Sequence, residues 1–314
     1  MKRKRIDVLV KGLLLAFIMV GSHACKNTTS KDAAKEEDNR AETNVEESDV
    51  AKFGGLALYT VRDAMGEDAR ATLKAVADAG YENIEAAGYV DGKFYNMAPD
   101  AFKSYLEELG LNPISTHQGS VTLENADAMM ADVKTAGFEY FVIPVPPMGL
   151  FSFDQETRTM GMTGGAKNLA EILDTLGEKA NAAGLKLLYH NHDFEFKENE
   201  DGVVPIDYLL EHCNPEFVNF QMDLYWVTKA GADPIAYFDK YPGRFKAWHV
   251  KDMDEQGRFA PVGEGTIDFK TILAQKERSG MQYYFVEQDM TFDGLEPLEA
   301  IKISHEGIGN IGFK

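Results

Sequence analysis

From Phe53 to the end of the chain, amphipathic stretches alternate with short apolar runs, and a glycine separates the two at five places. Helices often end at a residue with positive φ, which glycine adopts without a steric penalty from a Cβ atom. The pattern therefore predicts five junctions at which a helix ends and a strand begins. These junctions are Gly80 before 81–87, Gly110 before 111–116, Gly137 before 138–143, Gly184 before 185–189 and Gly280 before 281–286.

Three further apolar runs, at 55–59, 217–222 and 245–250, bring the number of predicted strands to eight. Strands that alternate with helices are typical of a parallel sheet. Eight such strands can form an open, doubly wound sheet or a closed barrel, but no Gly-x-Gly-x-x-Gly motif follows the first strand, which weakens a dinucleotide-binding open sheet. We expect residues 51–314 to form one α/β domain, a (β/α)8 TIM barrel.

The first residues differ in character from the rest of the chain. A basic start, MKRKR, precedes the apolar run 8–20, which is too short to span a membrane comfortably. Residues 1–24 are therefore predicted to be a signal peptide, and the small residues before Cys25 resemble a bacterial lipobox, in which the cysteine is lipidated. The alternative is an uncleaved anchor with an incidental cysteine. In both cases we expect export, to the bacterial periplasm or outer membrane.

Residues 25–50 are polar and acidic, with Val45 and Val50 as the only large aliphatic side chains. A segment of this composition cannot bury enough apolar surface to offset the entropy lost on ordering, so we expect a flexible tether. If Cys25 is acylated, Cys213 has no partner for an intramolecular disulfide and is expected to be buried.

The formal net charge of −19 restricts the partners of the chain. Nucleic acids and anionic membrane surfaces are bound through basic groups, so both are excluded as partners, and membrane contact is expected only through the lipid anchor. The charge favours a small, neutral or cationic molecule and leaves a homo-oligomer open.

Polar residues of chemically useful types follow the predicted strands directly. They are Glu85, His117, His190, His192, Asp223, His249 and Glu287. The active site of a (β/α)8 barrel lies at the carboxyl ends of its strands, so these side chains are expected to meet. Since four successive strands each offer a metal-ligand type, the pattern predicts a metal site.

Five segments carry a resemblance to a known family. They are 187–196 (LLYHNHDFEF), 221–226 (QMDLYW), 247–252 (AWHVKD), 261–269 (PVGEGTIDF) and 285–288 (FVEQ). Together they make residues 53–314 similar to the xylose-isomerase-like barrels, which include sugar phosphate isomerases and epimerases, inosose dehydratases and keto-sugar epimerases. The resemblance implies one metal ion at the ends of strands five to eight, commonly held by Glu, Asp, His and Glu. It thereby implies Asp223, His249 and Glu287 as ligands.

The strand-five position that matches the family's first glutamate holds His190, and His192 has the same orientation because side chains alternate along a strand. We predict His190 as the fourth ligand, with His192 as the alternative. Two imidazoles and two carboxylates suit Zn²⁺, Mn²⁺, Fe²⁺, Co²⁺ or Ni²⁺ better than Ca²⁺ or Mg²⁺. The change also removes one of the two bases that many keto-sugar epimerases place on opposite faces of the substrate, and Glu85, His117 or Glu195 are the candidate replacements.

A divalent metal can stabilise the enediolate that forms when the proton next to a carbonyl is removed. We expect Glu287 or His117 to carry this proton. Lys251 is expected to bind a substrate oxygen, or instead to form an ion pair with Asp252 or another carboxylate at the barrel mouth. Trp226 is expected to pack against a sugar face, or else within the core. Further substrate contacts are predicted from Glu85, His192 and Glu195.

Two loops bear on the substrate. Glu264, between two glycines after strand seven, would repel a phosphate where barrels often bind one, so an unphosphorylated sugar or keto sugar is expected. The segment 144–165 is too long for a plain connection and is predicted to form a lid or a subunit contact.

The predicted reaction is isomerisation or epimerisation, and hydration or dehydration of a keto sugar through the same enediolate is the alternative. A non-catalytic carbohydrate-binding lipoprotein is a further option, which the complete set of four ligands disfavours. A metal-dependent endonuclease is disfavoured by the acidic net charge.

Overall fold

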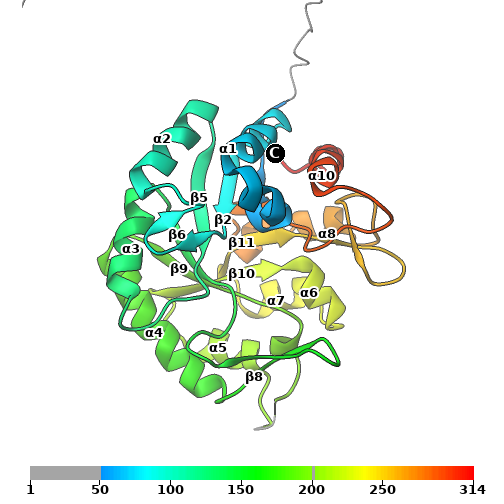
Figure 1. Ribbon diagram of the computed structural model, residues 1–314. Helices are drawn as coiled ribbons and strands as arrows, with labels where there is room; N and C mark the ends of the chain where they lie inside the picture. Colours follow the sequence, from blue (N-terminus) through cyan, green and yellow to red (C-terminus); the bar gives the residue numbers. More distant parts are fainter. Residues whose placement is uncertain (1–50, 200–201) are drawn as a thin grey trace, which may run out of the picture. The chain divides into compact units, whose positions relative to one another are not determined.

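Eight short parallel strands close into a barrel in the computed structural model, which describes residues 51–199 and 202–314 (Figure 1). The strands are β1 (Gly55–Ala57), β2 (Asn83–Ala86), β5 (Asn112–His117), β6 (Tyr140–Ile143), β9 (Lys186–His190), β10 (Val218–Asp223), β11 (Phe245–Val250) and β14 (Tyr283–Val286). Each pairs in parallel with its two neighbours, and β1 pairs with both β2 and β14. The closed barrel is confirmed, and the open sheet is excluded.

Helices surround the strands as an outer ring (Figure 1). They are α1 (Arg62–Asp78), α2 (Pro99–Leu109), α3 (Ala126–Thr135), α4 (Ala166–Ala182), α5 (Pro205–His212), α6 (Leu224–Lys229), α7 (Pro234–Lys240), α8 (Phe269–Leu273), α9 (Lys276–Ser279) and α10 (Pro297–Ile311), with the 3-10 helices η1 (Leu58–Val61) and η2 (Phe194–Phe196). Three two-stranded hairpins lie outside the barrel. They are β3–β4 (Tyr89–Val90, Lys93–Phe94), β7–β8 (Phe151–Asp154, Thr159–Met162) and β12–β13 (Asp252–Met253, Phe259–Ala260).

The five glycines expected at the helix-to-strand junctions all have positive φ, between 68° and 100°. Gly110 shows the reason most directly. It ends α2 in the left-handed conformation, and its N–H donates to the carbonyl oxygen of Glu107 in the last turn. The junction pattern read from the sequence is therefore confirmed.

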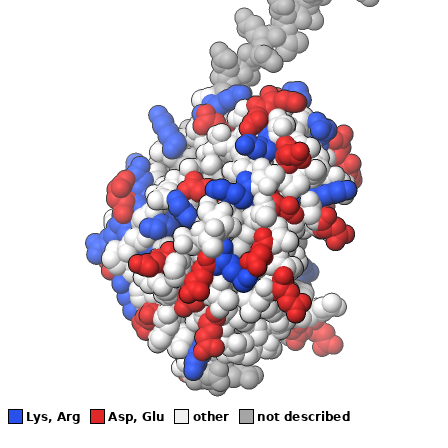
Figure 2. Space-filling model, turned by 90° about the vertical axis from the view of Figure 1, so that its left-hand side faces the viewer, with Lys and Arg blue, Asp and Glu red and all other residues white. Residues whose placement is uncertain are grey.

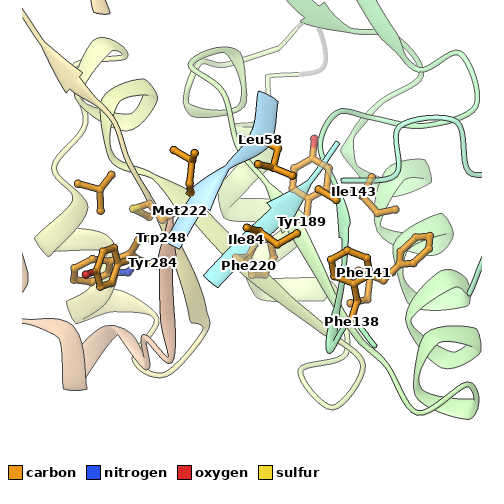
Figure 3. Packing of buried hydrophobic residues seen from close by; sticks show 14 of the residues in the cluster. Leu58, Ile84, Phe138, Phe141, Ile143, Tyr189, Phe220, Met222, Trp248 and Tyr284 are labelled. Carbon is orange, nitrogen blue, oxygen red and sulfur yellow. The ribbon is translucent and has the colours of Figure 1, made fainter. Parts of the chain in front are cut away.

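Large apolar side chains cover the outer face of the strands, where the helices pack. Ile84, Phe141, Tyr189, Phe220 and Trp248 belong to this layer (Figure 3). Each is at most 1% exposed, and burying a side chain of this size contributes about 1.5–3 kcal/mol. The helix–strand interface thus supplies most of the apolar packing.

A separate, smaller cluster fills the inside of the barrel. It consists of Ala57, Tyr140, Val142, Leu188, Ala247 and Phe285. Because side chains alternate along a strand, the residues that follow in phase also point inward. On β11, the inward-pointing Ala247 is therefore followed by His249. The polar groups thus lie directly above the apolar side chains that fill the barrel.

Charges of both signs are interspersed on the side of the molecule that carries α2, α3 and α4 (Figure 2). Lys179 on α4, for example, bonds Asp127 on α3 at 2.8 Å. This face offers no basic stripe of the kind that binds nucleic acid.

None of the helices in residues 51–199 and 202–314 is both long and apolar enough to cross a membrane. The predicted signal peptide, Cys25 and the predicted tether lie outside the described residues. Cys213 is buried as expected, at 2% exposure, and burial raises the pKa of its thiol to about 12.

Candidate active site

Side chains from five strand ends meet at the carboxyl end of the barrel. They are Glu85 (β2), His117 (β5), His190 (β9), Gln221 and Asp223 (β10), and His249 (β11), and they are joined by Lys251 and Glu287 just beyond β11 and β14. Apart from His117, whose side chain is 12% exposed, all of these residues are at most 4% exposed. The convergence expected from the sequence is therefore present in the structure.

His249 lies between two carboxylates. Its Nδ1 is 2.7 Å from Glu287 Oε2, and its Nε2 is 2.5 Å from Glu85 Oε1. Burial opposes the charged imidazolium, but the two carboxylates outweigh it and raise the pKa of His249 to about 10. Because a carboxylate only accepts, both ring nitrogens of His249 carry a proton in this arrangement. A metal held by Glu287 would replace the proton on Nδ1, while Glu85 would keep the one on Nε2.

Glu85 is an acceptor for four groups and does not line the cavity. Besides His249, it accepts hydrogen bonds from Ser115 Oγ at 2.5 Å and Gln221 Nε2 at 2.6 Å, and it lies 2.9 Å from His117 Nε2. Burial raises the pKa of Glu85, but His117 and His249 hold it well below its usual range. The expected substrate contact is corrected here, because Glu85 points inward below the rim and is covered by the two histidines.

Gln221 links Glu85 to two histidines and determines which of their ring nitrogens are protonated. Since Glu85 only accepts, the amide nitrogen of Gln221 must face it. The amide oxygen then faces His190 Nδ1 at 2.9 Å and His117 Nε2 at 3.0 Å. Both of these ring nitrogens are protonated, so His190 keeps its lone pair on Nε2, which lies 3.9 Å from Asp223 Oδ2. Burial lowers the pKa of His190 well below its usual range, which keeps the ring neutral.

Lys251 brings a buried positive charge to the same place. Its Nζ lies 2.9 Å from Asp223 Oδ2, 2.7 Å from Glu287 Oε2 and 3.0 Å from Asp289 Oδ1. Burial disfavours the ammonium, but the three carboxylates outweigh it and raise the pKa of Lys251 well above its usual range. Of the two roles considered for Lys251, the ion pair with barrel-mouth carboxylates is present.

Asp252 is not a partner of Lys251. Its carboxylate accepts backbone N–H bonds from Met253, Gly263, Gly265 and Ile267. It therefore anchors the loop after β11.

The four predicted ligands offer the imidazole nitrogens and carboxylate oxygens that a first-row transition metal prefers. Ligand atoms of Asp223, His249 and Glu287 all lie within 4.8 Å of one another, and the free Nε2 of His190 faces Asp223. Two imidazole nitrogens and two carboxylates fit such an ion. A second group with compatible spacing consists of His117, His190 and His249, but Gln221 and Glu85 already engage Nε2 of His117.

His192 lines the cavity and packs on aromatic rings. Its ring centroid lies 5.5 Å from that of Trp226 and 6.1 Å from that of Phe194. Burial and the nearby Lys251 lower the pKa of His192 to about 3, so the ring is neutral. Its position agrees with a substrate contact better than with a ligand role.

Glu195 lies outside the cavity, so its expected substrate contact is corrected. Its carboxylate accepts a hydrogen bond from Tyr189 Oη at 2.8 Å and another from the backbone N–H of His192 at 2.8 Å. Tyr189 belongs to the outer face of β9, so η2 folds the carboxylate away from the barrel interior. Burial raises the pKa of Glu195 to about 8.

A cavity of about 600 Å³ opens above these groups. Its polar lining comprises Arg62, His117, Arg158, His190, His192, Lys251, Glu287 and Asp289. Its apolar lining includes Tyr59, Phe153, Met160, Trp226, Phe259 and Met290. Trp226 thus lies in the cavity wall. The segment 144–165, predicted to form a lid or a subunit contact, contributes Phe153, Arg158 and Met160 from the β7–β8 hairpin.

The sequence reasoning missed several of these residues. Gln221 has a detectable signal, because it is in phase with the predicted ligand Asp223 on β10. Asp289 has one as well, because it follows the predicted ligand Glu287 by two residues beyond β14. Arg62 and Arg158 have none, because they reach the cavity from a helix start and a hairpin turn.

Comparisons with known proteins agree with this architecture. Over 144 residues, the chain is 28% identical to an inosose dehydratase of Lacticaseibacillus casei, a match that covers 39% of this chain and 47% of the dehydratase. The matched region therefore spans about half the length of that relative.

Solved structures of the same fold match over most of the chain. A sugar phosphate isomerase/epimerase from Parabacteroides distasonis ATCC 8503 is 26% identical, with a TM-score of 0.69 over 82% of this chain and 97% of the other. The IOLI protein, solved with a bound zinc atom, has a TM-score of 0.61 at 16% identity over 83% and 97% of the two chains, which supports the fold alone. Residues 73–302 match the model of the xylose isomerase-like TIM barrel family, so the chain belongs to that family.

Proposed function

We propose that this chain is an enzyme that uses one divalent metal ion to remove a proton next to the carbonyl of an unphosphorylated keto sugar. The observation that carries the proposal is the group of Asp223, His249 and Glu287, whose ligand atoms lie within 4.8 Å of one another, with His190 Nε2 at 3.9 Å from Asp223 Oδ2. The second ring nitrogen of each histidine is engaged by Gln221 or Glu85. When bound, such a metal supplies a Lewis acid for negative charge on substrate oxygens. Relatives that act as dehydratases or isomerases/epimerases support an enzyme.

His117 is the residue that we assign to carry the proton. It lines the cavity, and because Gln221 and Glu85 hold a proton on its Nε2, its Nδ1 is free to accept another. Glu287, the other candidate, already shares Oε2 between His249 and Lys251. Lys251 stays protonated among its three carboxylates, and it would donate a hydrogen bond to a substrate oxygen in place of one of them.

Between the two reaction classes, the geometry favours dehydration or hydration over epimerisation. Epimerisation needs a second base on the opposite face of the substrate, and both glutamates considered for that role, Glu85 and Glu195, lie outside the cavity. In dehydration one group suffices. His117 takes the proton next to the carbonyl and returns it to the β-hydroxyl, which leaves as water while a carbon–carbon double bond forms. Isomerisation remains the second candidate because it passes through the same enediolate.

Product masses in D₂O test this proposal. We expect the metal-loaded protein, incubated with candidate keto sugars and their unsaturated derivatives, to exchange the proton next to the carbonyl for deuterium and to change the mass by one water. A product isomeric with its substrate, after correction for deuterium, would favour isomerisation. If no keto sugar exchanges this proton, the enediolate mechanism is excluded.

We also propose that the chain is exported and anchored to a bacterial membrane through a lipid on Cys25. The basis is the sequence of residues 1–50 alone. Mass spectrometry of the amino-terminal peptide from cells, with Cys25→Ala as the control, should detect a lipid on the native peptide. An unmodified Cys25 would contradict the anchor.

A further inference from the structure

A second cavity of about 500 Å³ lies next to the active-site cavity. The two share Arg62, Asp289 and Met290, so they adjoin along one side of the barrel mouth, next to the start of α1. His117 and two of the proposed ligands, His190 and Glu287, line only the first cavity. A single keto sugar at the metal ligands would therefore leave the second cavity to solvent.

Exposed apolar side chains line the first cavity, and one of them, Met290, also lines the second. Among the described residues, six large hydrophobic side chains are exposed, and Tyr59, Phe153 and Met290 line the first cavity. Their exposed fractions are 43%, 50% and 42%. Exposed apolar groups that gather at one site typically mark a surface that a ligand covers. Since the polar floor lies below them, they would contact a part of the substrate beyond its reacting unit.

Tyr59 is held in place at this boundary. The Arg62 guanidinium lies 4.4 Å from the centre of the Tyr59 ring, and Arg62 also donates a hydrogen bond to the Tyr59 carbonyl oxygen at 3.0 Å. A ring fixed by a cation on one face and the backbone is a preformed wall, so little entropy is lost when a ligand packs beside it.

Hydrogen-bond acceptors dominate the polar lining of the second cavity. Its carboxylates are Asp63, Glu67, Asp289 and Glu296, and it also contains Thr60, Thr291 and Gln288. Gln288 is 3% exposed, and its Oε1 has no hydrogen-bond partner within the described part of the chain. Acceptors in this number repel an anionic group and match a ligand with several hydroxyl donors.

We infer that the substrate has two sugar units. The reacting keto sugar occupies the polar floor, and a second, hydroxyl-rich glycosyl unit crosses the boundary at Arg62 and Met290 into the adjoining cavity. The assignment of the first unit rests on the proposed function, whereas the second rests on the shape and lining of the two cavities. The substrate class is therefore a keto disaccharide, and a free monosaccharide would fill only part of the site.

Tryptophan fluorescence can measure binding of each kind of sugar. The chain has two tryptophans: Trp226 lines the first cavity, whereas Trp248 is fully buried and stacks on Phe238 behind the barrel wall. We expect the metal-loaded full chain to bind the best of maltose, cellobiose and isomaltose about tenfold more tightly than glucose, since each additional hydrogen bond contributes about fivefold.

Two variants locate the second unit. Glu67→Ala, in the second cavity, is expected to weaken disaccharide binding about fivefold and to leave glucose binding unchanged. Glu107→Ala, an exposed position on α2 away from both cavities, is the matched control and should change neither. Circular dichroism of both variants checks that the barrel is intact.

The outcomes separate this inference from the proposed function. Equal affinity for glucose and every disaccharide, an equal effect of Glu67→Ala on both, or no binding of any sugar would overturn the inference. Phenyl glucoside binding more tightly than the disaccharides, without sensitivity to Glu67→Ala, would also overturn it by identifying the second unit as aromatic. A preference for disaccharides in a protein that exchanges no α-proton would support the second unit while contradicting the proposed reaction.

Discussion

At the scale of single residues, Glu85 is the group on which the orientation of the metal ligands depends. It accepts from His249 Nε2 directly and fixes His190 through Gln221. Replacing Glu85 by Gln puts an amide donor where an acceptor is needed, so His249 loses its preferred tautomer. We expect Glu85→Gln to lower metal affinity about 10–100-fold while the barrel stays folded, measured by titration against a competing chelator.

Ser115→Ala is the control for this substitution. It removes one hydrogen bond to Glu85 but keeps the carboxylate, so metal affinity should fall by less than in Glu85→Gln. If Glu85→Gln binds metal as tightly as the unaltered chain, Glu85 does not position the ligands.

The two histidines at the end of β9 should differ in their effect on the metal. His190 keeps a free Nε2 that faces Asp223, whereas His192 packs between Trp226 and Phe194. We expect His190→Ala to lower metal affinity more than His192→Ala, in chelator competition on matched preparations. An equal or reversed order would make His192 the strand-five ligand.

Glu195 should make stability depend on pH. Its pKa of about 8 in the folded chain exceeds the value of 4.5 expected when unfolded, so the folded state holds a proton that the unfolded state releases between these pH values. The free energy of unfolding therefore falls as pH rises from about 4.5 to 8, by a few kcal/mol at most, at about 1.4 kcal/mol per pKa unit. Glu195→Gln should remove this part of the dependence in urea titrations across the range, and parallel curves would contradict the assignment.

The sequence predicts which residue types lie at the strand ends, but it does not predict whether each side chain lines the cavity or is buried beneath it. Alternation predicts that Glu85 points inward, yet only the packing of His117 and His249 above it shows that it lies below the cavity. Glu195 is displaced by the turn of η2, which no periodicity reveals. Gln221 was overlooked because an amide neither ionises nor acts as a common metal ligand. It nevertheless determines which ring nitrogens of His190 and His117 are protonated.

At the scale of elements, the glycine pattern located five of the eight strands correctly because each marked glycine has a positive φ. The extent of β1 was overestimated. The run 55–59 continues into η1, since Leu58 packs with the outer core while the chain turns toward α1. Hairpins such as β7–β8 could not be located by this method, because a short solvated strand has no apolar run.

Two glycines within helices should respond oppositely to alanine. A Cβ on Gly307 in α10 would lie 1.8 Å from the Val262 carbonyl oxygen, whereas a Cβ on Gly66 in α1 meets nothing within 4 Å. Gly66→Ala should therefore stabilise the chain by about 0.5–1 kcal/mol through helix propensity. Gly307→Ala should destabilise it by about 1–3 kcal/mol through overpacking. Thermal and urea unfolding decide, and a stabilising Gly307→Ala would contradict the close contact of α10 with the loop after β11.

At the scale of the whole molecule, the apolar layers that hold the barrel together are separate from the polar groups at its mouth. The outer cluster and the inner cluster contain none of the four predicted ligands. A family resemblance and a strand count were enough to place the site, because barrels of this kind build it at one end. The second cavity was not predictable, since it depends on how α1 and the loop before α10 approach each other.

The metal content of the purified chain tests the central claim most directly. Elemental analysis of the unaltered protein and of Asp223→Ala, with circular dichroism on both, should find about one transition-metal ion per chain in the first and almost none in the second, while both remain folded barrels. A folded, unaltered chain that takes up no divalent metal when supplied with Zn²⁺, Mn²⁺, Fe²⁺, Co²⁺ or Ni²⁺, or an Asp223→Ala variant that keeps its metal, would contradict the account.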